Sequence, residues 1–196
     1  MKKFAFLACT VVLAGTGCFG SGEATEDTSA TGSIVDRASI LVEARENGLI
    51  MDELEILAMR AAVLEQDPQG RSPEDVVGYL ETNVKDWWSA ALADVTGGDG
   101  YGIAHTTFQG GTFTVLAEMG NLPEPASEYF YEAWLVRRDG ELAVLSLGPA
   151  QRIEDDYVVV YLTSTDFSDH DFFILTLESD DGNPAPGEHI LEGNIK

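Results

Sequence analysis

The second half of the chain is dominated by short apolar runs with strand-like alternation, and this pattern constrains the fold more than any other feature. From Ile103 onward the period changes to two residues, and β-branched and aromatic residues become frequent. We expect strands at 103–108, 111–118, 129–137, 141–147, 156–163, 171–178 and 188–192. Short strands separated by glycine, proline and aspartate turns predict an antiparallel β-sandwich over residues 104–196.

Two details refine this prediction. Asp139-Gly140 separates two apolar runs, and this dipeptide tolerates the positive φ angles of a tight hairpin turn. In residues 157–162 and 172–177, the odd-numbered and the even-numbered positions are both largely apolar. We therefore expect these two segments to be central strands with both faces covered.

Residues 33–94 instead carry apolar residues at three- and four-residue spacing, which predicts about three helices. The first begins at a capping pattern formed by Ser33 and Asp36, and ends near Asn47, where Gly48 favours a left-handed C-terminal turn. The second begins near Asp52. Its predicted apolar stripe consists of Ile50, Leu54, Leu57, Ala61 and Leu64.

A third helix is expected after the sequence Ser72-Pro73-Glu74-Asp75, which supplies an N-cap, a first-turn proline and two acidic residues. Its stripe would comprise Val77, Leu80, Val84, Trp87 or Trp88, Ala91 and Val95. The fold class predicted for the chain is therefore α+β with segregated parts, a helical segment followed by an antiparallel β-sandwich.

The glycine-rich residues 95–103 are predicted to link these two parts. Glycine-rich loops also bind phosphate, but such a loop follows a strand and precedes a helix. The predicted order here is the reverse, so phosphate binding is not expected.

The N-terminus has the layout of a secretory signal, which we assign to residues 1–17. Lys2 and Lys3 precede an apolar run that is too short to span a bilayer. The following Gly-Thr-Gly-Cys sequence resembles the lipobox of bacterial lipoproteins, which implies that Cys18 is lipidated and becomes the new N-terminus. The alternative is ordinary signal cleavage, which would give a secreted protein.

Cysteine usage agrees with lipidation, because Cys9 would leave with the signal and only Cys18 would remain. Residues 18–32 are small, polar and acidic, and we expect them to form a disordered tether. The predicted location is extracytoplasmic, with the lipid anchor as the contact with the membrane.

The formal net charge of −23 limits the possible partners. Such an excess of acidic residues repels nucleic acid and anionic lipid head groups, so neither is an expected ligand. No cofactor-binding motif is present in the sequence, and no cofactor is expected.

Several segments of the β region occur in an order typical of one family. They are Leu122-Pro123-Glu124-Pro125, Tyr131-Glu132-Ala133-Trp134-Leu135-Val136, Thr176-Leu177-Glu178 and Gly182-Asn183-Pro184-Ala185-Pro186. On these segments, residues 104–193 resemble the C-terminal extracytoplasmic domain of anti-sigma-K factor (RskA-type) proteins. The resemblance implies a β-sandwich outside the membrane. It does not extend to the cytoplasmic sigma-binding domain of that family, so anti-sigma activity is not implied.

Each candidate binding residue also has a purely structural interpretation, as part of the core. Tyr131 and Trp134 would line a pocket or, as we favour, fill the core. The neighbouring Trp87 and Trp88 would form a stacking platform, but adjacent helical residues do not share a face.

Acidic loop residues offer oxygen ligands of the kind that Ca²⁺ prefers. They are Asp155, Asp156, Asp166, Asp169, Asp171, Asp180 and Asp181, with His170 among them. None fits a calcium-loop pattern, and His105, His170 and His189 lack metal-ligand spacing, so no metal site and no catalytic residue is predicted.

The sequence thus predicts a non-catalytic, extracytoplasmic, lipid-anchored binding or sensory protein with an unidentified protein partner. A surface module that binds Ca²⁺ or glycan is the alternative, and a hydrolase is the third hypothesis.

Overall fold

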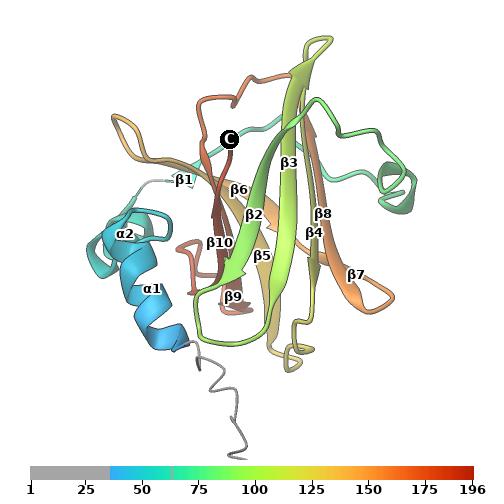
Figure 1. Cartoon of the computed structure of the whole chain (residues 1–196). Coiled ribbons are helices and arrows are strands. Elements are labelled where there is room, and N and C mark those ends of the chain that lie inside the picture. The colour runs from blue at the N-terminus through green and yellow to red at the C-terminus, as the bar shows by residue number, and fades with distance from the viewer. Residues whose placement is uncertain (1–35, 63) are drawn as a thin grey trace, which may run out of the picture. The chain divides into compact units, whose positions relative to one another are not determined.

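The computed structural model describes residues 36–62 and 64–196, so the signal, the lipidated Cys18 and the tether predicted for residues 1–32 lie outside the described residues. The described part is mostly a large mixed β-sheet with two short helices, α1 (Arg37–Glu46) and α2 (Glu53–Ala61), as Figure 1 shows. The strands are β1 (Leu64–Glu65), β2 (Trp88–Asp94), β3 (Tyr101–Gln109), β4 (Thr112–Gly120), β5 (Tyr129–Arg137), β6 (Ala143–Pro149), β7 (Gln151–Ile153), β8 (Asp156–Thr163), β9 (Phe172–Ser179) and β10 (Glu188–Asn194).

The strands form one continuous sheet in the order β1-β6-β5-β9-β10-β2-β3-β4-β8-β7. Only the β1–β6 pair is parallel, and the other pairs are antiparallel. The sheet curls so that its two halves face each other: Tyr131 of β5 packs edge-on against Tyr157 of β8, with ring centroids 4.9 Å apart. A single curled sheet therefore replaces the two separately hydrogen-bonded sheets of a sandwich.

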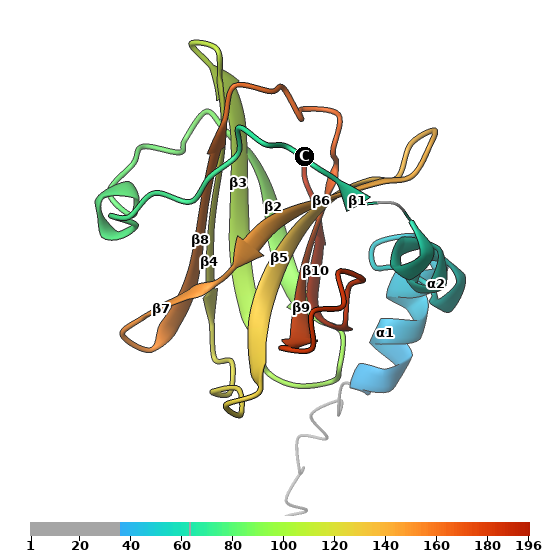
Figure 2. The same cartoon turned by 180° about the vertical axis from the view of Figure 1, so that it is seen from behind.

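The outer face of the curled sheet is apolar as well, and two different segments cover it. Over β5, β6 and β9, Met51 and Met59 pack with the buried Trp134, Phe172 and Ile174. Figure 2 shows α2 on this flank of the sheet, whereas the short 3₁₀ turn (Val77–Tyr79) lies on the opposite flank.

That opposite flank is covered by residues 66–87, which we call the strap. Val76 of the strap is buried against Leu116 of β4 and Val158 and Val160 of β8. The strap is attached to β8 by two backbone hydrogen bonds between Arg71 and Leu162, of 3.0 and 2.9 Å.

The seven predicted strands are all present, with ends that differ by a few residues. The Asp139-Gly140 turn joins β5 to its antiparallel neighbour β6, and Gly140 has a φ of +86°. The expectation that both faces of these strands are covered is confirmed, because β8 and β9 bury nearly every residue between their ends. β9 lies inside the sheet as expected, but β8 is next to the edge strand β7.

The predicted third helix is wrong. After the 3₁₀ turn the chain forms β2, which pairs with β3 and β10 in the middle of the sheet. Ala90 and Leu92 of β2 point into the core, while Ala91 lies on the exposed face. Local sequence preference for helix is overridden here by the burial that strand pairing provides.

The glycine-rich residues 95–103 do not separate two parts of the fold, since residues 36–196 form one compact unit. They contain the β2–β3 turn and the start of β3. The turn is organised by the Asp94 carboxylate, which accepts N–H bonds from Thr96, Gly98 and Gly100 at 2.9–3.1 Å. Burial raises the pKa of Asp94, but these hydrogen bonds outweigh burial and the pKa lies below its usual value.

Val76 and Val77 provide a matched test of the strap as a cover. Val76 is 2% exposed, whereas Val77 is 55% exposed. We expect Val76→Ala to lower the free energy of unfolding by roughly 2 kcal/mol through lost packing, and Val77→Ala to change it by less than about 0.5 kcal/mol. Urea unfolding measures both, and equal effects would contradict the assignment of the strap as a packed layer.

The lowered pKa of Asp94 predicts a pH dependence of stability. A carboxyl whose folded pKa is depressed stabilises the fold above its unfolded pKa of about 4, and this contribution is lost as the pH falls through the folded pKa. The stability difference between wild type and Asp94→Asn should therefore be largest at neutral pH and shrink between about pH 5 and pH 2. Urea unfolding at several pH values tests this, with the exposed Asp86→Asn as charge-matched control. An equal pH dependence in both variants would contradict the role of the turn.

Candidate functional site

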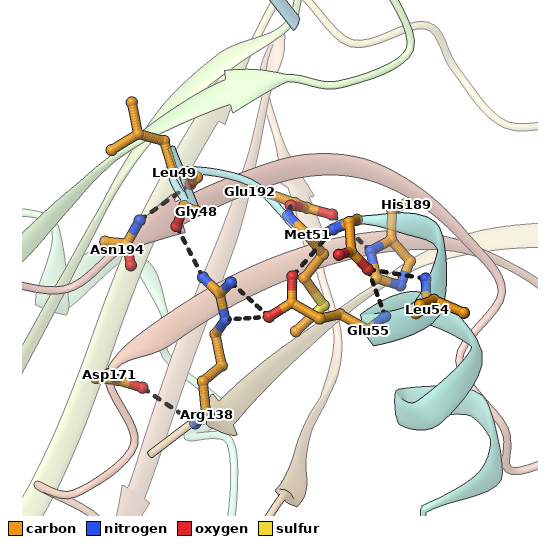
Figure 3. Close-up of polar contacts among 11 residues, drawn as sticks. Gly48, Leu49, Met51, Leu54, Glu55, Arg138, Asp171, His189, Glu192 and Asn194 are labelled. Atoms are coloured by element: carbon orange, nitrogen blue, oxygen red, sulfur yellow. Dashed lines mark hydrogen bonds and ion pairs between the residues drawn. The ribbon is translucent and has the colours of Figure 1, made fainter. Parts of the chain in front are cut away.

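The two helices are joined by residues 47–52, which we call the connector, and a polar network fixes the connector to the sheet (Figure 3). The start of α2 is a reciprocal cap. Asp52 accepts the N–H groups of Leu54 and Glu55 at 2.8 Å each, and its own N–H donates to the Glu55 carboxylate at 3.0 Å. The predicted start of the second helix at Asp52 is thus confirmed.

Arg138, which follows β5, holds both ends of the connector. Its Nε and Nη2 donate to Oε1 of Glu55 at 3.1 and 2.6 Å, and its Nη1 donates to the carbonyl of Gly48 at 3.1 Å. The guanidinium lies 4.5 Å from the ring centroid of Phe172, and the backbone N–H donates to Asp171. Most of the Arg138 side chain is buried, so this ion pair is less screened by water than a surface pair.

Glu192 of β10 anchors the middle of the connector from the sheet. It is 1% exposed, and its Oε2 accepts the N–H of Met51 at 2.6 Å. Its Oε1 lies 2.7 Å from Nδ1 of His189, a geometry in which the ring N–H donates to the carboxylate. Two positions further along β10, Asn194 Nδ2 donates to the carbonyl of Leu49 at 3.0 Å.

The other ring nitrogen of His189, Nε2, is buried and has no hydrogen-bond partner among the described residues. A histidine held by a carboxylate is typical of metal and proton-transfer sites. However, within residues 36–62 and 64–196 no group of three or more His, Cys, Asp or Glu side chains converges to hold a metal ion. The contacts that His189 does make position the connector.

The helices themselves expose an unusual amount of apolar surface. No residue of α1 is buried, and Met59 is the buried residue of α2. Leu54 is 76% exposed and Leu57 is 60% exposed, and Ala61 on the same side of α2 is exposed too. We call Leu54, Leu57 and Ala61 the outer stripe.

The sequence predicted these residues on one apolar stripe together with Ile50 and Leu64. Ile50 is buried and Leu64 is partly buried, but the outer stripe is exposed. The face of α2 that packs on the sheet carries Ile56 and Met59 instead. Because α2 is apolar on two sides, periodicity alone does not identify the buried side.

Other predicted candidates are core or connecting residues. Trp134 and Tyr131 are 2% and 3% exposed, as favoured from the sequence. The Trp134 indole N–H donates to Thr176 at 2.8 Å. Trp87, the last residue of the strap, packs against the cluster around Val76, while Trp88 lies on β2 and is 63% exposed.

Some of the acidic loop residues make contacts within the protein. Asp169 pairs with Arg137 at 2.7 Å and with Nδ1 of His170 at 2.8 Å. Asp166 accepts the N–H of Ser168, and Asp181 accepts that of Asn183. These three aspartates cap turns or form ion pairs, whereas no ion pair involves Asp155 or Asp156 among the described residues.

Two further titratable groups, Glu132 on β5 and His105 on β3, are half-buried in the sheet. Burial raises the pKa of Glu132, against a lowering by the Ser146 hydrogen bond, and the nearby Glu178 raises it further. Burial lowers the pKa of His105 on β3, while Glu118 raises it. Both shifts depend on strand register, so sequence spacing gave no signal for them.

Comparisons of the chain with family models, with curated proteins and with solved structures found no match. The resemblance of residues 104–193 to anti-sigma-K proteins therefore stays a prediction. In the described part of the chain, neither helix has the length and hydrophobicity needed to cross a bilayer.

Glu192 provides the test of the network. Glu192→Gln leaves one of the two buried N–H donors, on Met51 or His189, without an acceptor, which should lower the free energy of unfolding by about 1–3 kcal/mol. The exposed Glu188→Gln in the same strand is the control. Hydrogen exchange should quicken in the connector of Glu192→Gln but not of Glu188→Gln. Unchanged exchange at residues 48–51 would contradict the anchoring role.

Proposed function

We propose that the protein is a non-catalytic, extracytoplasmic binding protein, anchored by lipid at Cys18, that docks a protein partner on α2. The signal-like residues 1–17 and the Cys that follows them support export and anchoring. The resemblance of residues 104–193 to the outer domain of anti-sigma-K proteins supports a sensory or binding module, without sigma binding.

The outer stripe is the observation that carries this proposal. Leu54 and Leu57 lie one turn apart on the solvent side of α2, and Ala61 continues the same face. A helix that only covers a sheet has no need of leucines on its outer side. Exposed apolar residues gathered on one element are typical of a contact surface.

Charge defines the kind of partner. The outer stripe belongs to a protein of net charge −23, and Glu53 lies beside it on α2. A partner with basic residues around an apolar contact would be attracted, while another acidic protein would be repelled. The engagement of the loop aspartates in protein contacts favours a protein partner over calcium.

Cross-linking in the native cell envelope tests the proposal. The full-length protein should give a specific cross-linked species, and Leu54→Ser/Leu57→Ser should lower its yield at least about tenfold, since each buried leucine contributes roughly 2 kcal/mol. Val77→Ser, which changes an exposed apolar residue of the strap, should leave the yield unchanged.

Cys18→Ala is the anchor control and should lose the label of a palmitate analogue that the wild type incorporates. Cross-linking that is indifferent to Leu54 and Leu57 would contradict docking on α2. A labelled Cys18→Ala protein would contradict the lipid anchor.

A further inference from the structure

A second apolar surface, separate from the outer stripe of α2, lies between α1 and the β2–β3 hairpin. A groove of about 340 Å³ runs between them. Ile40 and Leu41 of α1 line one wall, and Leu92, Ala93 and Tyr101 line the other. Ile40 and Tyr101 are 49% and 62% exposed, so apolar surface remains open at the mouth.

The groove continues into an acidic hollow, and the two share Asp99 and Tyr101. The arginine of the groove and that of the hollow are already paired: Arg37 with Asp99, and Arg152 with Glu124 at 2.7 Å. Further into the hollow, Asp155 and Asp156 have no ion-pair partner among the described residues. Charge at the hollow therefore remains negative.

Tyr101 lies where the groove meets the acidic hollow. A Cβ atom at Gly120 would lie 2.9 Å from the Tyr101 hydroxyl, so the glycine provides the space in which this ring lies. An aromatic ring beside carboxylates offers a face to an apolar side chain and to a cation.

The polar contacts between the start of α1 and the β2–β3 turn are exposed. Arg37 donates to the carbonyl of Gly98 at 2.9 Å and pairs with Asp99, and both side chains of that pair are more than half exposed. Such pairs contribute little to stability. α1 itself buries no residue, so the wall that it forms is lined by partly exposed side chains.

We propose that the groove and the hollow together bind a peptide segment of a partner protein in which apolar residues alternate with lysine or arginine. This inference rests on the proposed function and specifies the chemistry of its partner. The apolar side chains occupy the space between α1 and β2, and the basic side chains meet Asp155 and Asp156.

Fluorescence polarisation with the full-length protein and a labelled peptide of alternating leucine and lysine tests the proposal. Ile40→Ser and Asp155→Asn/Asp156→Asn should each weaken binding at least about fivefold. Glu74→Gln/Glu81→Gln, which removes two exposed acidic residues of the strap, should leave it unchanged. A peptide with serine in place of leucine should bind weakly although its charge is the same.

Equal binding of the serine peptide, equal effects of the two charge variants, or no binding by the wild type would each overturn the proposal. Asp155→Asn/Asp156→Asn changes two exposed residues at the start of β8, so it tests the site even where Ile40→Ser disturbs α1. If peptide binding fails while envelope cross-linking still depends on Leu54 and Leu57, only this inference is overturned. If the peptide binds at this site but cross-linking ignores those leucines, docking on α2 fails instead.

Discussion

The organisation of this protein follows from a sheet that is apolar on both faces. The inner face closes on itself because the sheet curls, as the contact between Tyr131 and Tyr157 records. The outer face does not close on itself, so other segments of the chain must cover it. Apolar surface left in water costs about 25 cal/mol per Å². The connector and α2 cover one flank through Met51 and Met59, and the strap covers the other through Val76. The outer face of β2 and β3, beside α1, has the lightest cover, and the groove is found there.

Polar contacts determine where the helical cover lies. Apolar packing of Met51 and Met59 is non-directional and would tolerate sliding. The hydrogen bonds of Glu192 and Arg138 fix the connector at defined positions of β10 and the β5–β6 turn. Burying the Glu192 carboxylate is costly unless it is fully hydrogen-bonded, so its two donors specify one arrangement. This buried network therefore holds the connector and the start of α2 in place.

The sequence predicted the parts of the fold that depend on local pattern. The strands after Ile103, the Asp139-Gly140 turn, the end of α1 at Asn47 and the start of α2 at Asp52 all have short-range signals. The strand nature of 88–94 was missed because its alanines favour helix, and only pairing with β3 and β10 shows which faces are buried. The site was less predictable still: Arg138 and Glu55 are 83 positions apart, and Met51 and Glu192 are 141 apart. Contacts at such separations depend on sheet order, which spacing in the sequence does not encode.

The two-sided character of α2 connects the architecture to binding. Ile56 and Met59 suffice to cover the sheet, so the fold does not require Leu54 and Leu57 on the opposite side. A polar residue at either position would improve solubility without loss of packing. The leucines therefore carry a cost in the isolated protein that an interaction would offset.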